Sequence, residues 1–266
     1  MSKTINIWSG EAASYDTYRP QAPSIIMDIL TQLAHTQRPQ LVIDLGCGTG
    51  LSTRMWTERV EHIVGIEPNA DMRQQAEVST AKLSSAKNIT YQDGLSTQTH
   101  LPSNSADIVT CSQALHWMEP EPTFAEIARI LRPGGIFAAY DYDWPPTMHW
   151  EAEQSENIVA TRFRALRSGR GLDHDVKSWS KEKHLERMRD SNLFRYTKEI
   201  TLHNVEYGNA DRFIGLVLSW GSVRYLKQGV TEQELGIDQL KEVAHRVIGE
   251  EPIPWYLSYR VRIGVK

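Results

Sequence analysis

Glycines at close spacing form the strongest chemical signal in the sequence. Residues 41–50 read LVIDLGCGTG, so a short apolar run ends at Asp44 and glycines follow at alternate positions. Glycine lets the backbone turn sharply and lie against a ligand, because no Cβ intervenes. A helix that begins after such a turn points its free amide groups at the ligand. The pattern predicts a nucleotide-like ligand at a strand–helix junction. The glycines are Gly46, Gly48 and Gly50.

Two acidic residues follow later apolar runs, at positions suited to a nucleoside. Glu67 comes directly after the run HIVGI, about twenty residues beyond the glycines, where a carboxylate can accept hydrogen bonds from both ribose hydroxyls. Asp93 in the segment YQDG can accept a hydrogen bond from an adenine amine, although an Asp-Gly pair is equally typical of a plain turn. The two acids indicate an adenosine-type ligand without separating NAD from other adenosine cofactors.

Strand and helix patterns alternate along the first half of the chain. Continuous apolar runs indicate strands of a sheet that is covered on both faces. Strands separated by helices form right-handed crossovers, which predict a parallel sheet. We therefore expect an α/β fold with a Rossmann-like, doubly wound, mostly parallel seven-stranded sheet. The expected strands are residues 40–45, 62–66, 88–91, 106–111, 135–140, 195–203 and 254–265.

Capping residues predict where helices begin. Asn69 and Asp71 are both suited to cap a helix that extends to about Lys82. Thr123 and Glu126 have the spacing of a capping box. Residues 209–227 and 231–248 are each expected to form one helix. We expect one domain of residues 1–266, with a core of residues 37–141, the strands 195–203 and 254–265, and helical cap insertions 142–193 and 207–250.

Composition excludes several classes of protein. The chain has 266 residues, of which 40% are hydrophobic and 23% charged, as in soluble globular proteins. It has no apolar stretch near the ~20 residues of a membrane span, and its first residues lack a signal core, so we expect a cytoplasmic protein. Cys47 and Cys111 do not form a CxxC pair, so we expect neither a metal site nor a disulfide framework.

The net charge of −4 is unevenly distributed. Residues 161–198 hold 11 Lys and Arg against 5 Asp and Glu, a local excess of +6. Mixed charges at helical spacing are typical of a solvated face, and attraction of an anionic substrate is a second interpretation. Nucleic acid is a third partner to consider, but the acidic chain and the few aromatic residues of this stretch count against it.

Taken together, the motifs resemble those of the class I S-adenosylmethionine-dependent methyltransferases over about residues 41–140. Residues 44–50 resemble motif I of that class, and the two acids match its ribose and adenine contacts. The segment ADIVTCSQALHWM at 106–118 resembles the fourth strand and its loop, and LRPGG at 131–135 resembles the turn before the fifth strand. Both chain ends, with YRP at 18–20 and the terminal YRVRIGVK, resemble small-molecule members, including the methyltransferase type 11 or trans-aconitate methyltransferase-like group.

The resemblance implies S-adenosylmethionine as the cofactor, since the turn reads GxGxG rather than the GxGxxG of dinucleotide binders. It also implies that the turn and Asp44 hold the amino group, and that Gln113 flanks the sulfonium. Within an N-terminal segment folded over the cofactor, Arg19 would pair with the methionine carboxylate. The expected cofactor-binding residues are Tyr15, Arg19, Asp44, Gly46, Cys47, Gly48, Gly50, Glu67, Pro68, Met72, Asp93, Gly94 and Gln113.

The expected acceptor is a small molecule that offers a carboxylate or a hydroxyl. A carboxylate needs no base at neutral pH, whereas a hydroxyl usually does, and His116 is the candidate base. Packing of His116 and Trp117 against the next helix is the alternative. An RNA or tRNA methyltransferase and an NAD(P)-dependent oxidoreductase are the rival functions, although the latter would need a proton donor such as a Tyr-x-x-x-Lys pair, which we do not find. The expected substrate residues are His116, Trp117, Tyr142, Trp144, Trp220 and Arg224.

Overall fold

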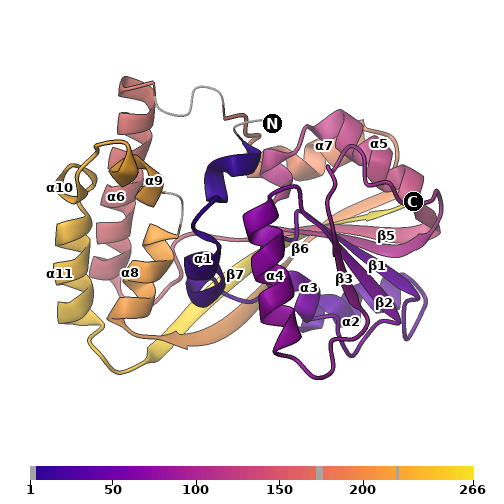
Figure 1. Cartoon of the computed structure of the whole chain (residues 1–266), viewed down its shortest axis with the longest axis horizontal. Coiled ribbons are helices and arrows are strands. Elements are labelled where there is room, and N and C mark those ends of the chain that lie inside the picture. The colour runs from indigo at the N-terminus through magenta and orange to yellow at the C-terminus, as the bar shows by residue number, and fades with distance from the viewer. Residues whose placement is uncertain (1–3, 172–175, 220–221) are drawn as a thin grey trace. The chain divides into compact units, whose positions relative to one another are not determined.

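The computed structural model contains one seven-stranded sheet (Figure 1). Its strands are β1 Leu41–Leu45, β2 His62–Ile66, β3 Ile89–Gln92, β4 Ala106–Ser112, β5 Leu131–Tyr142, β6 Tyr196–Gly208 and β7 Ile253–Val265. They lie in the order β3-β2-β1-β4-β5-β7-β6. The strands from β3 to β5 pair in parallel, and β7 runs antiparallel to β5. The predicted Rossmann-like, mostly parallel sheet is confirmed.

The structure describes residues 4–171, 176–219 and 222–266, with residues 222–224 described by their backbone alone. The helices are α1 Ala12–Tyr18, α2 Ile25–Leu33, α3 Leu51–Arg54, α4 Ala70–Ala81, α5 Pro120–Ile130, α6 Trp150–Gly169, α7 His184–Asp190, α8 Ala210–Leu218, α9 Ser222–Lys227, α10 Glu232–Leu235 and α11 Ile237–Val247. Short 3-10 turns are η1 Ile5–Trp8, η2 Leu115–Trp117 and η3 Lys181–Lys183. Of the two candidate caps of α4, Asn69 is confirmed, because its side chain accepts a hydrogen bond from the Met72 amide at 3.1 Å, whereas Asp71 lies within the first turn.

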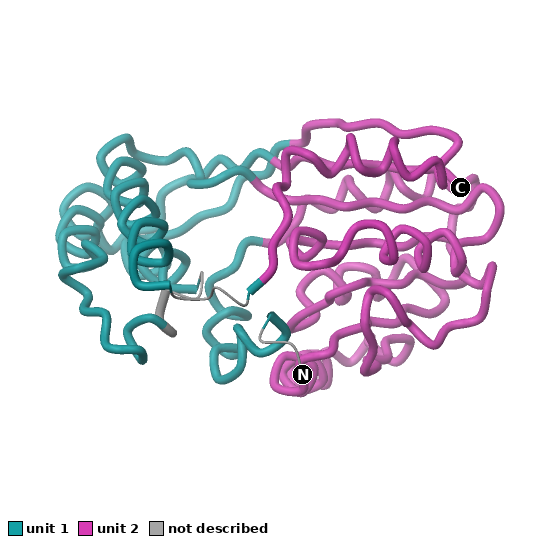
Figure 2. Tube along the Cα trace, turned by 90° about the horizontal axis from the view of Figure 1, so that it is seen from above, with its two compact units in different colours: residues 1–20, 143–176, 203–258 teal, residues 21–142, 177–202, 259–266 magenta. Residues whose placement is uncertain are grey.

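The chain divides into two compact units, which Figure 2 shows in different colours. Unit 1 comprises residues 1–20, 143–176 and 203–258, and unit 2 comprises residues 21–142, 177–202 and 259–266. The boundary falls within β6 and β7, so both strands contribute to both units. The expectation of a single domain with two cap insertions stays a prediction.

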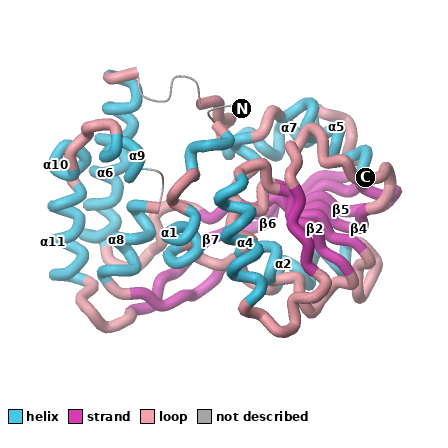
Figure 3. Tube along the Cα trace, viewed as in Figure 1, coloured by secondary structure: helices cyan, strands magenta, loops and turns pink. Residues whose placement is uncertain are grey.

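Unit 2 contains the parallel part of the sheet and the helices around it. In Figure 3, α5 and α7 lie on one side of these strands and α2 lies on the other. Phe124 and Ile127 of α5 and Met188 of α7 pack with Val109 and Phe137 of the sheet in one apolar cluster. Each large apolar side chain buried in this way contributes roughly 1.5–3 kcal/mol. This packing holds the carboxyl ends of β1, β2 and β4 in place.

Unit 1 is mostly helical and has its own apolar core. Phe213 of α8, Leu240 of α11 and Val159 of α6 are fully or almost fully buried in it, together with Trp255 of β7. The predicted single helix over residues 231–248 is wrong. Gly236 has φ +80°, a left-handed conformation that ends α10 before α11 begins.

The predicted helix over residues 209–227 is also wrong in extent. Helix α8 ends at Leu218, α9 begins at Ser222, and residues 220–221 lie outside the described part of the chain. The expected turn at 131–135 is instead part of β5, which begins at Leu131, directly after α5. The register of β5 against β4 shifts at this point, because the segment before Ile136 bulges out of the pairing.

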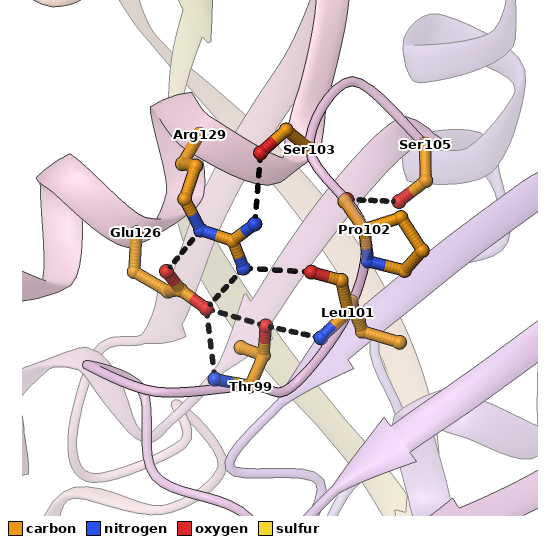
Figure 4. A network of polar contacts seen from close by, with 7 residues as sticks. All are labelled: Thr99, Leu101, Pro102, Ser103, Ser105, Glu126 and Arg129. Atoms are coloured by element: carbon orange, nitrogen blue, oxygen red, sulfur yellow. Dashed lines mark hydrogen bonds and ion pairs between the residues drawn. The ribbon is translucent and has the colours of Figure 1, made fainter.

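The predicted capping box of Thr123 and Glu126 does not form, because α5 begins earlier, at Pro120. Glu126 instead accepts hydrogen bonds from the Thr99 amide at 2.8 Å and the Thr99 hydroxyl at 2.6 Å (Figure 4). Arg129 donates to the same carboxylate and to the Leu101 carbonyl. Glu126 therefore joins α5 to the loop that precedes β4.

Cys47 and Cys111 are both buried free thiols. Among the described residues, no helix is long and apolar enough to cross a membrane. Within the same ranges there is no group of three or more His, Cys, Asp or Glu side chains that could hold a metal ion.

Candidate functional site

The glycine turn connects β1 to α3 at the carboxyl edge of the sheet. The φ angles are +65° at Gly46, +56° at Gly48 and +78° at Gly50, all in the left-handed region that favours glycine. A Cβ at Gly46 would lie 2.7 Å from Met118 Cε and 2.8 Å from Ala114 Cβ. The end of the methionine side chain can move aside but the alanine Cβ cannot, so the packing favours glycine there. A Cβ at Gly48 would meet nothing closer than Met72 at 3.6 Å. The turn therefore leaves room beside Gly48, where a bound group can lie against the backbone.

Asp44, the last polar residue before this turn, is fully buried. Its carboxylate accepts hydrogen bonds from the hydroxyls of Ser52 at 2.6 Å, Thr53 at 2.7 Å and Thr110 at 3.0 Å. Burial raises the pKa of Asp44, and the three hydroxyl donors offset part of that rise. Asp44 thus holds α3 and β4 against the turn, and its expected contact with a cofactor amino group stays a prediction.

Glu67 follows β2 and joins the glycine turn to the start of α4. Its Oε2 accepts a hydrogen bond from the Gly48 amide at 3.0 Å, and its Oε1 accepts one from the Asn69 amide at 2.9 Å. Burial raises the pKa of Glu67, while these two amides and the nearby Arg73 lower it. Carboxylate oxygens can each accept more than one hydrogen bond, so lone pairs remain for the hydroxyls of a ligand.

Asp93 lies just after β3, with its side chain 74% exposed. The Arg73 guanidinium lies 3.4 Å from Asp93 Oδ1 and also donates to the Glu67 carbonyl at 2.5 Å. Arg73 was missed in the sequence because its spacing matches no motif, although it connects both acidic strand ends. Met72 is buried near Gly48, whereas Pro68 is partly exposed and Gly94 lies against the side chain of Ile66.

Gln113 follows β4 in an unusual backbone conformation. Its φ of +55° is left-handed, although glutamine carries a Cβ. Its amide donates to the Tyr140 carbonyl at 2.9 Å, and its Oε1 accepts a hydrogen bond from Lys181 Nζ at 2.9 Å. The Nε2 atom is buried and has no hydrogen-bond partner among the residues that the structure describes.

His116 and Trp117 lie in η2, with ring centroids 4.6 Å apart. The His116 Nδ1 atom lies 4.0 Å from Asp141 Oδ1, and the His116 carbonyl accepts a hydrogen bond from the Trp179 amide at 2.8 Å. Tyr142, at the end of β5, is buried beside the ring of Tyr259. The structure thus brings His116 close to a carboxylate, and the role of these residues in substrate binding stays a prediction.

An ion network with two buried members, Asp141 and Arg262, lies beside this region. The Asp141 carboxylate contacts Lys181 Nζ at 2.8 Å and Arg262 Nη1 at 3.0 Å, and Arg262 Nε donates to Glu199 at 2.7 Å. Burial by itself would raise the pKa of Asp141, but Lys181, His116 and Arg262 together lower it below its usual value. The sequence signal for this network is weak, because Asp141 ends an apolar run and its partners are distant in the chain.

The expected N-terminal contacts lie in unit 1. The Arg19 guanidinium lies over the rings of Tyr15 at 4.6 Å, Trp144 at 5.6 Å and Trp8 at 5.9 Å, and donates to the Ser219 carbonyl at 3.0 Å. Trp220 lies outside the described residues, and so does the side chain of Arg224. Contacts of this group with a cofactor or substrate stay predictions.

Comparison with known proteins finds similarity to methyltransferases over part of the chain. Residues 43–139 match the sequence model of a methyltransferase domain. A probable S-adenosylmethionine-dependent methyltransferase of Saccharomyces cerevisiae is 30% identical over 136 residues, which are 51% of this chain and 46% of that protein. An uncharacterised methyltransferase of Mycobacterium tuberculosis is 34% identical over 149 residues, 54% of this chain and 56% of that one. The chain thus spans about half the length of these curated relatives.

The fold agrees with these matches. The structure of a putative type II methyltransferase from Anaeromyxobacter dehalogenans superposes with a TM-score of 0.62 at 21% identity, covering 94% of this chain and 98% of that one. Fold and sequence together define a class I S-adenosylmethionine-dependent methyltransferase domain. Residues 43–139, which match the methyltransferase-domain model, include β1, the glycine turn, Glu67 and Gln113.

The residues of this chain fit the cofactor of that class. The left-handed glycine turn offers room beside Gly48, Glu67 keeps lone pairs for hydroxyl groups, and Gln113 presents a buried donor. All three lie at the carboxyl ends of neighbouring parallel strands, where open α/β sheets bind their ligands.

Proposed function

We propose that the protein transfers the methyl group of S-adenosylmethionine to a small-molecule acceptor. The observation that carries this proposal is the hydrogen bond between Glu67 and the Gly48 amide, which brings the glycine turn and the expected ribose-binding acid together. The cofactor, when bound, supplies a methyl group already activated by a sulfonium. The protein then needs to bind the cofactor, exclude water and align the acceptor with the methyl group. Such positioning can lower the activation free energy by roughly 7–11 kcal/mol.

Each binding residue has a separate task in this proposal. Glu67 accepts the ribose hydroxyls, and Asp93, exposed after β3, accepts the adenine amine. Asp44 holds the turn through its three hydroxyl donors. Gln113 flanks the sulfonium end from the carboxyl end of β4.

Two acceptor chemistries fit the surroundings of His116. A hydroxyl acceptor loses its proton during transfer, and His116 accepts that proton while Asp141 stabilises the resulting imidazolium at 4.0 Å. A carboxylate acceptor is already ionised and needs no base. Replacement of His116 by Asn separates the two, because turnover falls for a hydroxyl acceptor and is unchanged for a carboxylate acceptor.

A small molecule is favoured over nucleic acid by the contacts of the basic stretch. Six of its basic side chains donate hydrogen bonds within the protein, which leaves fewer donors for phosphates. These residues are Arg162, Arg167, Arg170, Lys181, Arg187 and Arg189. We also propose that the protein is located in the cytoplasm.

Isothermal titration calorimetry with S-adenosylhomocysteine, and with NADH in a parallel titration, tests the cofactor. We expect S-adenosylhomocysteine to bind and NADH not to bind. Consumption of S-adenosylmethionine is then measured with panels of small carboxylic acids, small alcohols and unmodified tRNA. A folded protein that does not bind S-adenosylhomocysteine, or that methylates only tRNA, would contradict the proposal.

A further inference from the structure

Lys181 joins two polar groups that the motifs of the chain do not connect. Its ammonium lies 2.9 Å from Gln113 Oε1 and 2.8 Å from Asp141 Oδ1. Both partners belong to unit 2 and are 68 and 40 residues away in the sequence, since 181 − 113 = 68 and 181 − 141 = 40. An ammonium has three protons, so these two contacts leave one for a further acceptor.

The contact with Lys181 determines which atom of the Gln113 side-chain amide group faces the ammonium. An ammonium can only donate, so the side-chain oxygen of Gln113 is the atom that contacts it, and the side-chain NH2 is left for another acceptor. That NH2 is the buried Nε2, for which the described residues offer no acceptor. A buried donor without an acceptor destabilises a folded protein, so its presence indicates that a ligand provides the acceptor.

Backbone strain at Gln113 is a second, independent indication. A residue with a Cβ at φ +55° is held there against its preference, and such residues concentrate at ligand-binding positions. The backbone amide of Gln113 donates a hydrogen bond to the Tyr140 carbonyl, and this contact stabilises the left-handed conformation. The surroundings thus maintain Gln113 in the position in which its side-chain oxygen accepts from Lys181 and its NH2 is left for another acceptor.

The charges around Lys181 favour an anion. Asp141 neutralises part of the ammonium charge, but the same carboxylate also pairs with Arg262, which is buried and therefore unable to leave it. The Lys181 side chain is 33% exposed and the Arg262 side chain 3%, so Lys181 is the one of these two cations that a ligand can reach. An ammonium beside a neutral NH2 offers two donors, which suits the two oxygens of one carboxylate.

We propose that Gln113 and Lys181 together bind a carboxylate at the carboxyl end of β4, with Asp141 positioning Lys181. The inference rests on the proposed function, which brings two carboxylates to this region. One belongs to the amino-acid end of the cofactor, and the other belongs to a carboxylic acid acceptor. The chemistry is the same for both, and binding experiments distinguish the two sources without any turnover.

Lys181→Met and Gln113→Leu each remove one donor, and Lys181→Arg keeps a cation. Lys183→Met is the matched control, because it removes a charge from an exposed residue of the same 3-10 turn. Thermal unfolding verifies that each variant folds. Because Asp141 keeps Arg262 as a partner, we expect Lys181→Met to fold, and Gln113→Leu provides an independent test.

Binding of S-adenosylhomocysteine is compared with that of 5′-methylthioadenosine, which lacks the amino-acid end. If the cofactor carboxylate is the ligand, both donor variants lose about tenfold affinity for S-adenosylhomocysteine and none for methylthioadenosine, while Lys181→Arg retains part of it. Glutarate serves as a probe for an acceptor carboxylate, and dimethyl glutarate, which has no free carboxylate, is its control. If the acceptor carboxylate is the ligand, glutarate raises the melting temperature of the wild-type protein and dimethyl glutarate does not. Both donor variants then keep their affinities for the two adenosine compounds but are no longer stabilised by glutarate.

Affinities and glutarate stabilisation equal to those of the wild type in both donor variants would overturn the proposal. A wild-type protein that binds neither adenosine compound would instead contradict the proposed function. The glutarate measurement, repeated without cofactor, would then still decide whether the carboxylate site exists.

Discussion

The carboxylate of Glu67 and the backbone amide of Gly48 are in direct contact, with Oε2 3.0 Å from the nitrogen. This hydrogen bond connects the residue that follows β2 to the middle of the turn that follows β1. The other carboxylate oxygen receives the Asn69 amide at the start of α4. One side chain therefore shapes the glycine turn and orients the next helix before any ligand arrives.

Replacement of Glu67 by Gln tests this arrangement. The amide of glutamine has one acceptor oxygen, so it can satisfy the Gly48 amide or the Asn69 amide but not both. We expect affinity for S-adenosylhomocysteine to fall by about tenfold or more, because hydrogen bonds to a charged group contribute roughly 1.5–3 kcal/mol. Calorimetry measures the affinity, and Glu77→Gln on the exposed face of α4 is the control. Equal affinity in Glu67→Gln and the wild type would refute this role.

Replacement of Gly46 by Ala adds both backbone strain and a steric clash. The φ of +65° is unfavourable for alanine, and its Cβ would lie 2.8 Å from the rigid Cβ of Ala114 as well as 2.7 Å from Met118 Cε. We expect a loss of about 2–4 kcal/mol in the free energy of unfolding, measured with urea. Gly249→Ala separates the two causes, because Gly249 has φ +74° but no atom within 4 Å of the added Cβ. We expect this control to lose only about 1 kcal/mol, and equal losses would exclude the clash.

The Glu126 network predicts a loss of stability in acid. Its hydrogen bond with Arg129, together with the contacts to Thr99, lowers the pKa of Glu126 from 4.5 to about 2. A carboxyl group whose pKa is lower in the folded state stabilises the protein at every pH above its pKa in the unfolded chain. For Glu126 this stabilisation is lost as the pH falls from 4.5 towards 2.

We therefore expect Glu126→Gln to be less stable than the wild type at neutral pH, by about 2 kcal/mol, and to approach it near pH 2. Urea unfolding across this pH range measures the difference. Glu121→Gln, exposed on the same helix, should show no such convergence. A constant difference between Glu126→Gln and the wild type at every pH would contradict the linkage.

Glu156 of α6 predicts the opposite pH dependence. This side chain is buried in unit 1, and burial raises its pKa from 4.5 to about 7, against the opposing charge of Arg164. The folded protein keeps a proton that the unfolded chain releases, so stability falls as the pH rises from 4.5 to 7. We expect Glu156→Gln to be more stable than the wild type at about pH 8, by on the order of 2 kcal/mol, and similar to it at about pH 4.5. Thermal unfolding at both pH values provides the measurement, with Glu242→Gln as control, and a wild-type protein whose stability rises across this window would disprove it.

Much of unit 2 could be predicted from the sequence because its signals are local. The glycine turn, the apolar runs of β1, β2 and β4, and the Asn69 cap each depend on residues within a few positions of one another. Glu67 was recognised for the same reason, since its position follows directly from the end of β2. Residues within a few positions of one another in the sequence are sufficient to determine backbone geometry and hydrophobic periodicity.

Other features were decided only by tertiary contacts. Glu126 has the spacing of a capping residue, yet its carboxylate bonds to Thr99 because α5 starts at Pro120 and turns this side chain towards the loop before β4. Gln113 was expected to lie beside the cofactor, but its contact with Lys181 follows no sequence pattern. Local spacing determined where the glycine turn and the acidic strand ends occur. The packing of strands and helices decided which charged and polar groups meet, because the strength of a hydrogen bond or ion pair depends on distance in space and not on separation along the chain.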